Sequence, residues 1–166
     1  MQVIPLGHFT MRSAQNAGSR GVFGDMASLV KHLPHYDEPA TLILLKGHLL
    51  IEELLRGYID RKLPNPAAFK HDQFLFAKVL MLCRSLTHPK EKSWAFDAAR
   101  KLNEVRNEIA HELESPDLQV RLESFVVLVE QHANDSAFPP KERGAARLYM
   151  AIADLHNELI RVLHAS

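Results

Sequence analysis

This chain has a single cysteine, no net charge and no long hydrophobic run, and each of these features excludes a class of protein. Cys83 is the only cysteine among 166 residues, so no intramolecular disulfide can form and a reducing, cytoplasmic location is expected. Twenty Lys and Arg balance twenty Asp and Glu, so the chain has no overall positive charge. Any contact with a polyanion must therefore be made by a local patch of basic residues. The apolar runs fall short of the roughly 20 residues that cross a bilayer, so we expect neither a membrane span nor a signal peptide.

The composition is that of a folded, soluble, single-domain protein. Hydrophobic residues make up 46% of the chain and charged residues 24%, which is typical of a protein with a buried core. The first residues mix Gly, Ser, Asn and Pro without sustained periodicity. We therefore predict a flexible N-terminal arm over 1–24 and a single helical domain over 25–166.

Apolar residues recur three and four positions apart through this domain, and no strand-like alternation competes with them. The pattern predicts an all-α bundle of four to five long helices plus a short N-terminal helix. The short helix is expected over 25–33, and the long helices over 40–62, 71–86, 93–113, 116–133 and 141–164. The apolar residues of the helix over 40–62 spread around too much of its circumference to form a single stripe. Such a helix packs against neighbours on more than one side, so we expect it to be central. Ser115 and Pro116 are expected to cap and begin the fourth long helix.

The segment "EVRNEIAHEL" places an arginine, an asparagine and a histidine close together within the helix over 93–113. At about 100° per residue, its apolar positions cluster on one side and predict the core face. These positions are Ala98, Leu102, Val105, Ile109 and Leu113. The opposite face is expected to be polar and carries Arg100, Asn103, Asn107, Ala110, His111 and Glu114, with Arg106 at its edge. The small Ala110 would let another helix or a phosphate come close.

Arg106 and His111 differ in chemistry in a way that suits phosphate esters. A guanidinium stays cationic and grips phosphate through two hydrogen bonds, whereas an imidazole exchanges a proton near neutral pH. The motif Arg-Asn-x-x-x-His, formed by Arg106, Asn107 and His111, resembles the signature of the HEPN superfamily. The earlier segment "GHLLIEELLRGYID" is similar to the helical layout of small bacterial HEPN proteins. The resemblance covers the chain from Thr41 onward in architecture, but only the short motif is specific.

The resemblance implies a metal-independent endoribonuclease, of a toxin or defence-like kind, that leaves 2′,3′-cyclic phosphate and 5′-hydroxyl ends. The enzyme would be a homodimer whose two motifs face each other across one cleft that binds RNA. His111 would act as general acid or base, and Arg106 would neutralise charge on the phosphate. Asn107 would orient the histidine or the phosphate. A cognate antitoxin or regulatory protein is the further partner that the resemblance suggests.

Further candidates for substrate binding are Arg100, Asn103, His48 and Glu52. His48 and Glu52 lie one helical turn apart, either as a pair that faces the cleft or as a partly buried pair that fixes helix packing. Glu108 and Glu114 would repel RNA, and Arg100 partly offsets them. The competing interpretation of the whole chain is a dimeric helical interaction or regulatory module of the same fold without activity.

Motifs of other enzyme classes are absent from the sequence. There is no Gly-rich phosphate loop, no Gly-x-Ser-x-Gly elbow and no dinucleotide fingerprint. Ten histidines are many for this length, but they form no His-Glu-x-x-His spacing and no paired cysteines accompany them. We therefore predict no metal and no cofactor.

Overall fold

The computed structural model describes residues 29, 31–70, 73–88, 93–111, 116–133 and 144–165. Within them the chain forms five α-helices, one 3-10 turn and no strand, so the prediction of an all-α bundle is confirmed. The elements are α2 (Ala40–Lys62), η1 (Pro66–Ala68), α3 (Phe76–Leu86), α4 (Ala95–His111), α5 (Leu118–His132) and α6 (Ala145–His164). None of these helices is both long and apolar enough to cross a membrane.

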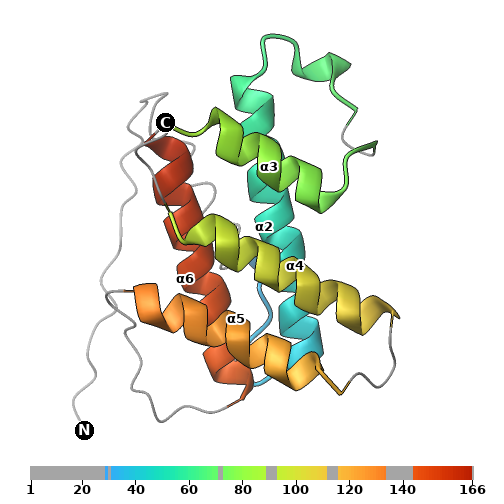
Figure 1. Cartoon of the computed structure of the whole chain (residues 1–166), viewed down its shortest axis with the longest axis vertical. Helices are drawn as coiled ribbons and strands as arrows, with labels where there is room; N and C mark the ends of the chain where they lie inside the picture. The colour runs from blue at the N-terminus through green and yellow to red at the C-terminus, as the bar shows by residue number, and fades with distance from the viewer. Residues whose placement is uncertain are drawn as a thin grey trace, which may run out of the picture.

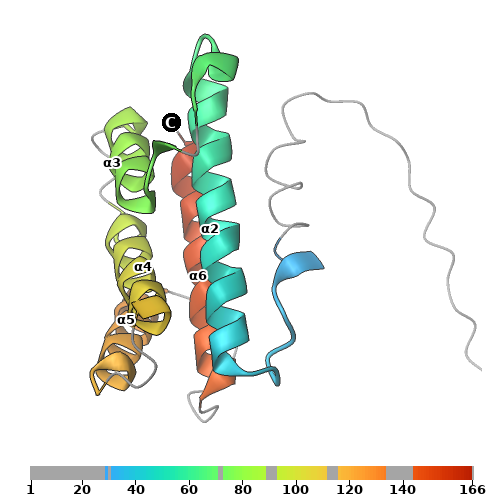
Figure 2. The same cartoon turned by 90° about the vertical axis from the view of Figure 1, so that its right-hand side faces the viewer.

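The helices form two layers. The long helices α2 and α6 run side by side in one layer, and α3, α4 and α5 cover them in the other (Figures 1 and 2). Large side chains from both layers fill the space between them with almost no exposure. They include Ile51, Leu55 and Tyr58 of α2, Leu102 of α4, Phe125 of α5, and Ile152, Leu155 and Leu159 of α6. Burial of this apolar surface is the main force that holds the layers together.

α2 is the central helix, and it begins and ends at the predicted residues. It follows Pro39 and stops before Pro64, because proline in a helix interior lacks the N–H needed for the backbone ladder. It packs against α3, α4 and α6, as its wide apolar arc predicts. At Gly47 an added Cβ would lie 2.6 Å from Cδ1 of Ile152, so glycine lets the backbone of α2 approach α6 closely.

The other helices differ from prediction mainly at their starts. α3 begins at Phe76 rather than at residue 71, and the rings of Phe69 and Phe74 pack together in the segment before it, with centroids 4.6 Å apart. α4 begins at Ala95, whose N–H donates to Oγ of Ser93 over 3.0 Å, so Ser93 precedes the helix instead of belonging to it. These starts are set by contacts with neighbouring segments, which periodicity does not report.

α5 begins at Leu118, and Pro116 lies in the turn before it, so the prediction that Pro116 is the first helical residue is wrong. The proposed cap Ser115 lies outside the described residues, as do 112–114, 141–143 and the arm over 1–24. Of the short helix expected over 25–33, Leu29, Lys31 and His32 are described and helical.

Cys83 is fully buried. Its Sγ donates to the carbonyl of Leu55 over 3.3 Å, and burial raises the pKa of the thiol to about 12. A thiol with that pKa is almost wholly protonated at neutral pH, so Cys83 packs as a small hydrophobe and is no nucleophile.

Candidate functional site

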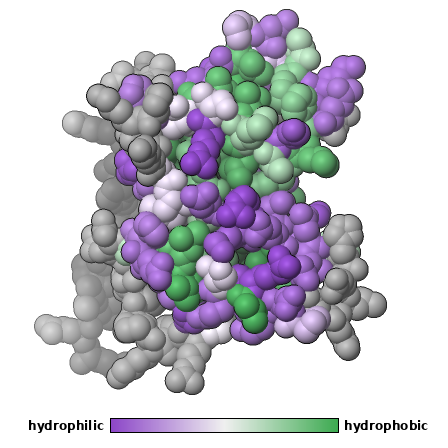
Figure 3. Space-filling model, viewed as in Figure 1, coloured by the Kyte–Doolittle hydropathy of each residue, from purple (hydrophilic) through white to green (hydrophobic). Residues whose placement is uncertain are grey.

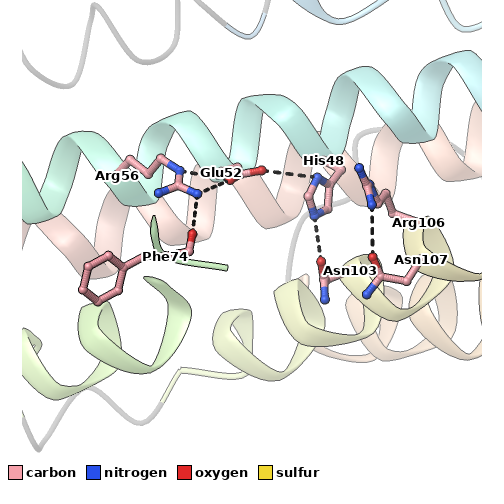
Figure 4. A network of polar contacts seen from close by, with 7 residues as sticks. All are labelled: His48, Glu52, Arg56, Phe74, Asn103, Arg106 and Asn107. Atoms are coloured by element: carbon pink, nitrogen blue, oxygen red, sulfur yellow. Dashed lines mark hydrogen bonds and ion pairs between the residues drawn. The ribbon is translucent and has the colours of Figure 1, made fainter. Parts of the chain in front are cut away.

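Arg106 and Asn107 lie on the C-terminal half of α4, and both are half-buried. Nη1 of Arg106 donates to Oδ1 of Asn107 over 3.2 Å, which restrains the guanidinium beside the amide (Figure 4). His111 is the last residue of α4, and its side chain lies outside what the structure describes. Arg106 and His111 are five positions apart, which corresponds to a rise of about 7.5 Å along the helix, so both belong to the same end of α4.

Arg106 differs from most other arginines of the described chain in having no carboxylate partner there. The arginines that form ion pairs with described Asp or Glu residues are Arg56, Arg84, Arg100, Arg121, Arg147 and Arg161. Arg61 shares the lack of a described partner, but it is exposed near the end of α2. Arg106 is therefore a half-buried cation that no described carboxylate neutralises.

Asn103 faces α2, where it meets a buried histidine. Nε2 of His48 lies 3.1 Å from Oδ1 of Asn103 and donates to it in the Nε2-protonated tautomer. The His48 ring is 3% exposed and packs on Phe76, with ring centroids 4.6 Å apart. The prediction that Asn103 lies on a polar face opposite the core is wrong, because α4 packs on α2 and α3 as well as on α5 and α6. The buried arc of α4 is consequently wider than its apolar positions suggest.

Glu52 and Arg56 extend this network along α2. Oε2 of Glu52 lies 3.9 Å from Nδ1 of His48, and Oε1 accepts a hydrogen bond from Nε of Arg56 over 2.9 Å. Nη2 of Arg56 also donates to the carbonyl of Phe74 over 2.8 Å, which ties the segment before α3 to α2. His48 thus joins the α2 pair to α4 (Figure 4). Sequence reasoning missed Arg56, although its spacing of four from Glu52 was a usable signal.

Arg100 belongs to a different part of α4. It is exposed and forms an ion pair with Glu104 one turn later. Glu108, which was expected to repel RNA, lies 3.4 Å from Nε of Arg121 on α5. That pairing offsets part of the negative charge of Glu108 near the motif.

Burial lowers the pKa of His48, and the positive charge of Arg106 lowers it further. The hydrogen bond that His48 donates to Asn103 and the charge of Glu52 oppose this effect by raising the same pKa. Since the net shift is downward from 6.5, the His48 imidazole is neutral at pH 7. A neutral ring supplies hydrogen bonds between α2 and α4 but no charge for phosphate.

This shift predicts a pH-dependent stability. Because the pKa of His48 is lower in the folded chain than in the unfolded chain, the unfolded chain binds more protons below pH 6.5. The free energy of unfolding of the wild type should therefore fall from pH 7.5 to 5.5 more steeply than that of His48→Gln, by at most about 1.4 kcal/mol per pH unit. Urea unfolding at both pH values measures the difference. Equal slopes for the two proteins would contradict it.

Comparison of the chain with protein-family models, with curated proteins and with solved structures gave no match in any of the three. Within the described residues, no group of three or more His, Cys, Asp or Glu side chains is placed to hold a metal ion.

Proposed function

We propose that this chain is a metal-independent endoribonuclease of the HEPN type that acts in the cytoplasm as a homodimer. The observation that carries the proposal is the guanidinium of Arg106, half-buried beside α2 and without a described carboxylate partner. A partly desolvated charge is costly without a counterion, so this position favours binding of an anion such as an RNA phosphate. Its location five residues before His111, at the same end of α4, supports the same assignment.

The proposed reaction assigns one role to each motif residue. The ribose 2′-oxygen attacks phosphorus, the bond to the 5′-oxygen of the next nucleotide breaks, and a 2′,3′-cyclic phosphate remains. His111 of one copy accepts the proton of the 2′-hydroxyl, and His111 of the second copy donates a proton to the leaving 5′-oxygen. Arg106 stabilises negative charge on the phosphate, and Asn107 holds the guanidinium in place. The need for an acid and a base together makes dimerisation part of the mechanism.

Asn103, His48 and Glu52 fit this proposal as supports and not as direct contacts with substrate. The His48–Asn103 hydrogen bond fixes how α4 lies on α2, and Arg106 follows Asn103 by one turn. A neutral His48 also adds no positive charge of its own beside Arg106. A toxin-like activity would further call for a cognate antitoxin or regulatory protein that blocks the cleft.

The experiment is cleavage of a mixed RNA pool by the purified protein in excess EDTA, followed by analysis of the fragment ends. We expect cleavage that the chelator does not inhibit, with cyclic phosphate and 5′-hydroxyl ends. No cleavage of several structured and single-stranded RNAs would refute the proposal.

A second candidate is the dimeric helical interaction or regulatory module without catalysis. It is favoured by the exposed leucines on α2, namely Leu42, Leu45 and Leu49, which suit a protein contact better than an RNA contact. This module would form the same dimer and bind a partner, but it would leave RNA intact. The cleavage assay separates the two candidates.

A further inference from the structure

α2 has a hydrophobic strip on its outer side in addition to its buried side. Leu42, Leu45 and Leu49 are 38%, 36% and 57% exposed, although the opposite side of α2 fills the core. At about 100° per residue the three leucines fall within an arc of about 60°. We call them the leucine face. Isolated exposed leucines are common on soluble proteins, but three on one helical stripe form a contiguous surface suited to helix packing.

Two exposed charges border the leucine face. Lys46 and Glu53 lie within about 20° of each other around α2, on the same edge of the strip. They are seven positions apart, a rise of about 10 Å, so they do not reach each other within the helix. Neither forms an ion pair with another residue of the described chain, whereas Arg100 of α4 and Arg147 and Arg161 of α6 do.

We propose that the leucine face is the surface on which two copies of this chain associate, with their α2 helices antiparallel and the two-fold axis beside Leu49. In that register Lys46 of one copy lies opposite Glu53 of the second copy, and the symmetry repeats the pair. An isologous contact must be self-complementary, and opposite charges three positions before and four positions after Leu49 meet that requirement. A different partner would not need this arrangement.

The exposed apolar surface of α3 is the rival, and its charges argue against self-association. Leu75 and Met81 are 80% and 57% exposed, and Figure 3 shows apolar residues gathered over α3. The exposed charges on this helix are Lys78 and Arg84, both positive, and of the two only Arg84 is paired, with Asp97 of α4. Two copies of α3 placed face to face would bring like charges together, so α2 is the better self-complementary surface.

This inference rests on the homodimer of the proposed function but not on its chemistry. Glu52, which belongs to the network at α4, follows Leu49 by three positions and borders the leucine face. An axis beside Leu49 therefore brings the two copies of the α2–α4 interface toward each other. Association and RNA cleavage are measured separately, so a dimer without cleavage refutes only the nuclease. A dimer that survives Leu49→Glu refutes only this surface.

The first test places a charge at the axis. Leu49→Glu puts two carboxylates opposite each other in the dimer, and sedimentation equilibrium should show a monomer with an unchanged helical circular dichroism spectrum. The matched control is Val120→Glu on α5, where the side chain is 68% exposed, and this variant should remain a dimer. A wild type that is monomeric at micromolar concentration, or a Leu75→Glu variant that dissociates while Leu49→Glu does not, would overturn the assignment.

The second test examines the register. Lys46→Glu and Glu53→Lys should each raise the dimer dissociation constant on the order of tenfold, because like charges then meet twice. Mixing these two variants should restore association as a heterodimer, since every charged pair is again opposite in sign. The double variant Lys46→Glu/Glu53→Lys should restore the homodimer. If the mixture associates no better than either variant alone, the antiparallel register is wrong.

Discussion

Gly47→Val should lower the free energy of unfolding by about 3 kcal/mol, because the valine has no room between α2 and α6. A Cβ on residue 47 would lie 2.6 Å from Cδ1 and 2.7 Å from Cγ2 of Ile152. Cγ2 is bonded directly to the Cβ of Ile152, so rotation of the outer part of the Ile152 side chain cannot move it away. The two helices must therefore separate. Urea unfolding followed by circular dichroism measures the loss.

Gly57 on the same helix provides the control. A Cβ there would meet only Nη1 of Arg61 at 3.6 Å, so Gly57→Ala should stabilise the protein by about 0.5 to 1 kcal/mol through helix propensity alone. The clash at Gly47 can also be isolated with Ile152→Ala. The double variant Gly47→Ala/Ile152→Ala should be less destabilised than the sum of its single changes. Strict additivity would show that Gly47 is not required for close packing on Ile152.

Arg106→Ala should reduce RNA cleavage at least about 100-fold, since the alanine variant has no cation to stabilise charge on the phosphate. His111→Ala should reduce it by about 100-fold to 10,000-fold through loss of proton transfer. Arg106→Lys should recover part of the activity, because an ammonium keeps the charge without the planar two-point grip. Initial cleavage rates on one RNA, measured beside circular dichroism and thermal melting, check all three.

Arg61→Ala is the matched control for charge. It removes one arginine that also lacks a described ion pair, but from the exposed end of α2, and it should leave the cleavage rate within about twofold. Cleavage that persists in His111→Ala would assign the activity to another site or to a contaminant. Equal losses of cleavage rate in Arg61→Ala and Arg106→Ala would show that positive charge promotes RNA binding in general, and that Arg106 does not belong to a specific site.

The helices themselves could be predicted because their signals are local. The bounds of α2 follow from flanking prolines and from apolar residues spaced at the helical period. On α4, the predicted core positions Ala98, Leu102 and Val105 are buried, and Ile109 packs against the core. The start of α3 was missed, because packing of Phe69 on Phe74 depends on the folded chain and not on the spacing of residues along α3.

The sequence by itself determined that one end of α4 carries an arginine, an asparagine and a histidine, and that α2 is apolar on more than one side. Only the tertiary structure decided which polar residues meet. His48 and Asn103 are 55 positions apart, and their hydrogen bond exists because α2 crosses α4 at that point. The same crossing half-buries Arg106, while Arg100, on the same helix, stays exposed and paired. Periodicity describes one helix at a time, whereas burial depends on every helix that packs against it, so the environment of each polar residue was set by the assembled bundle.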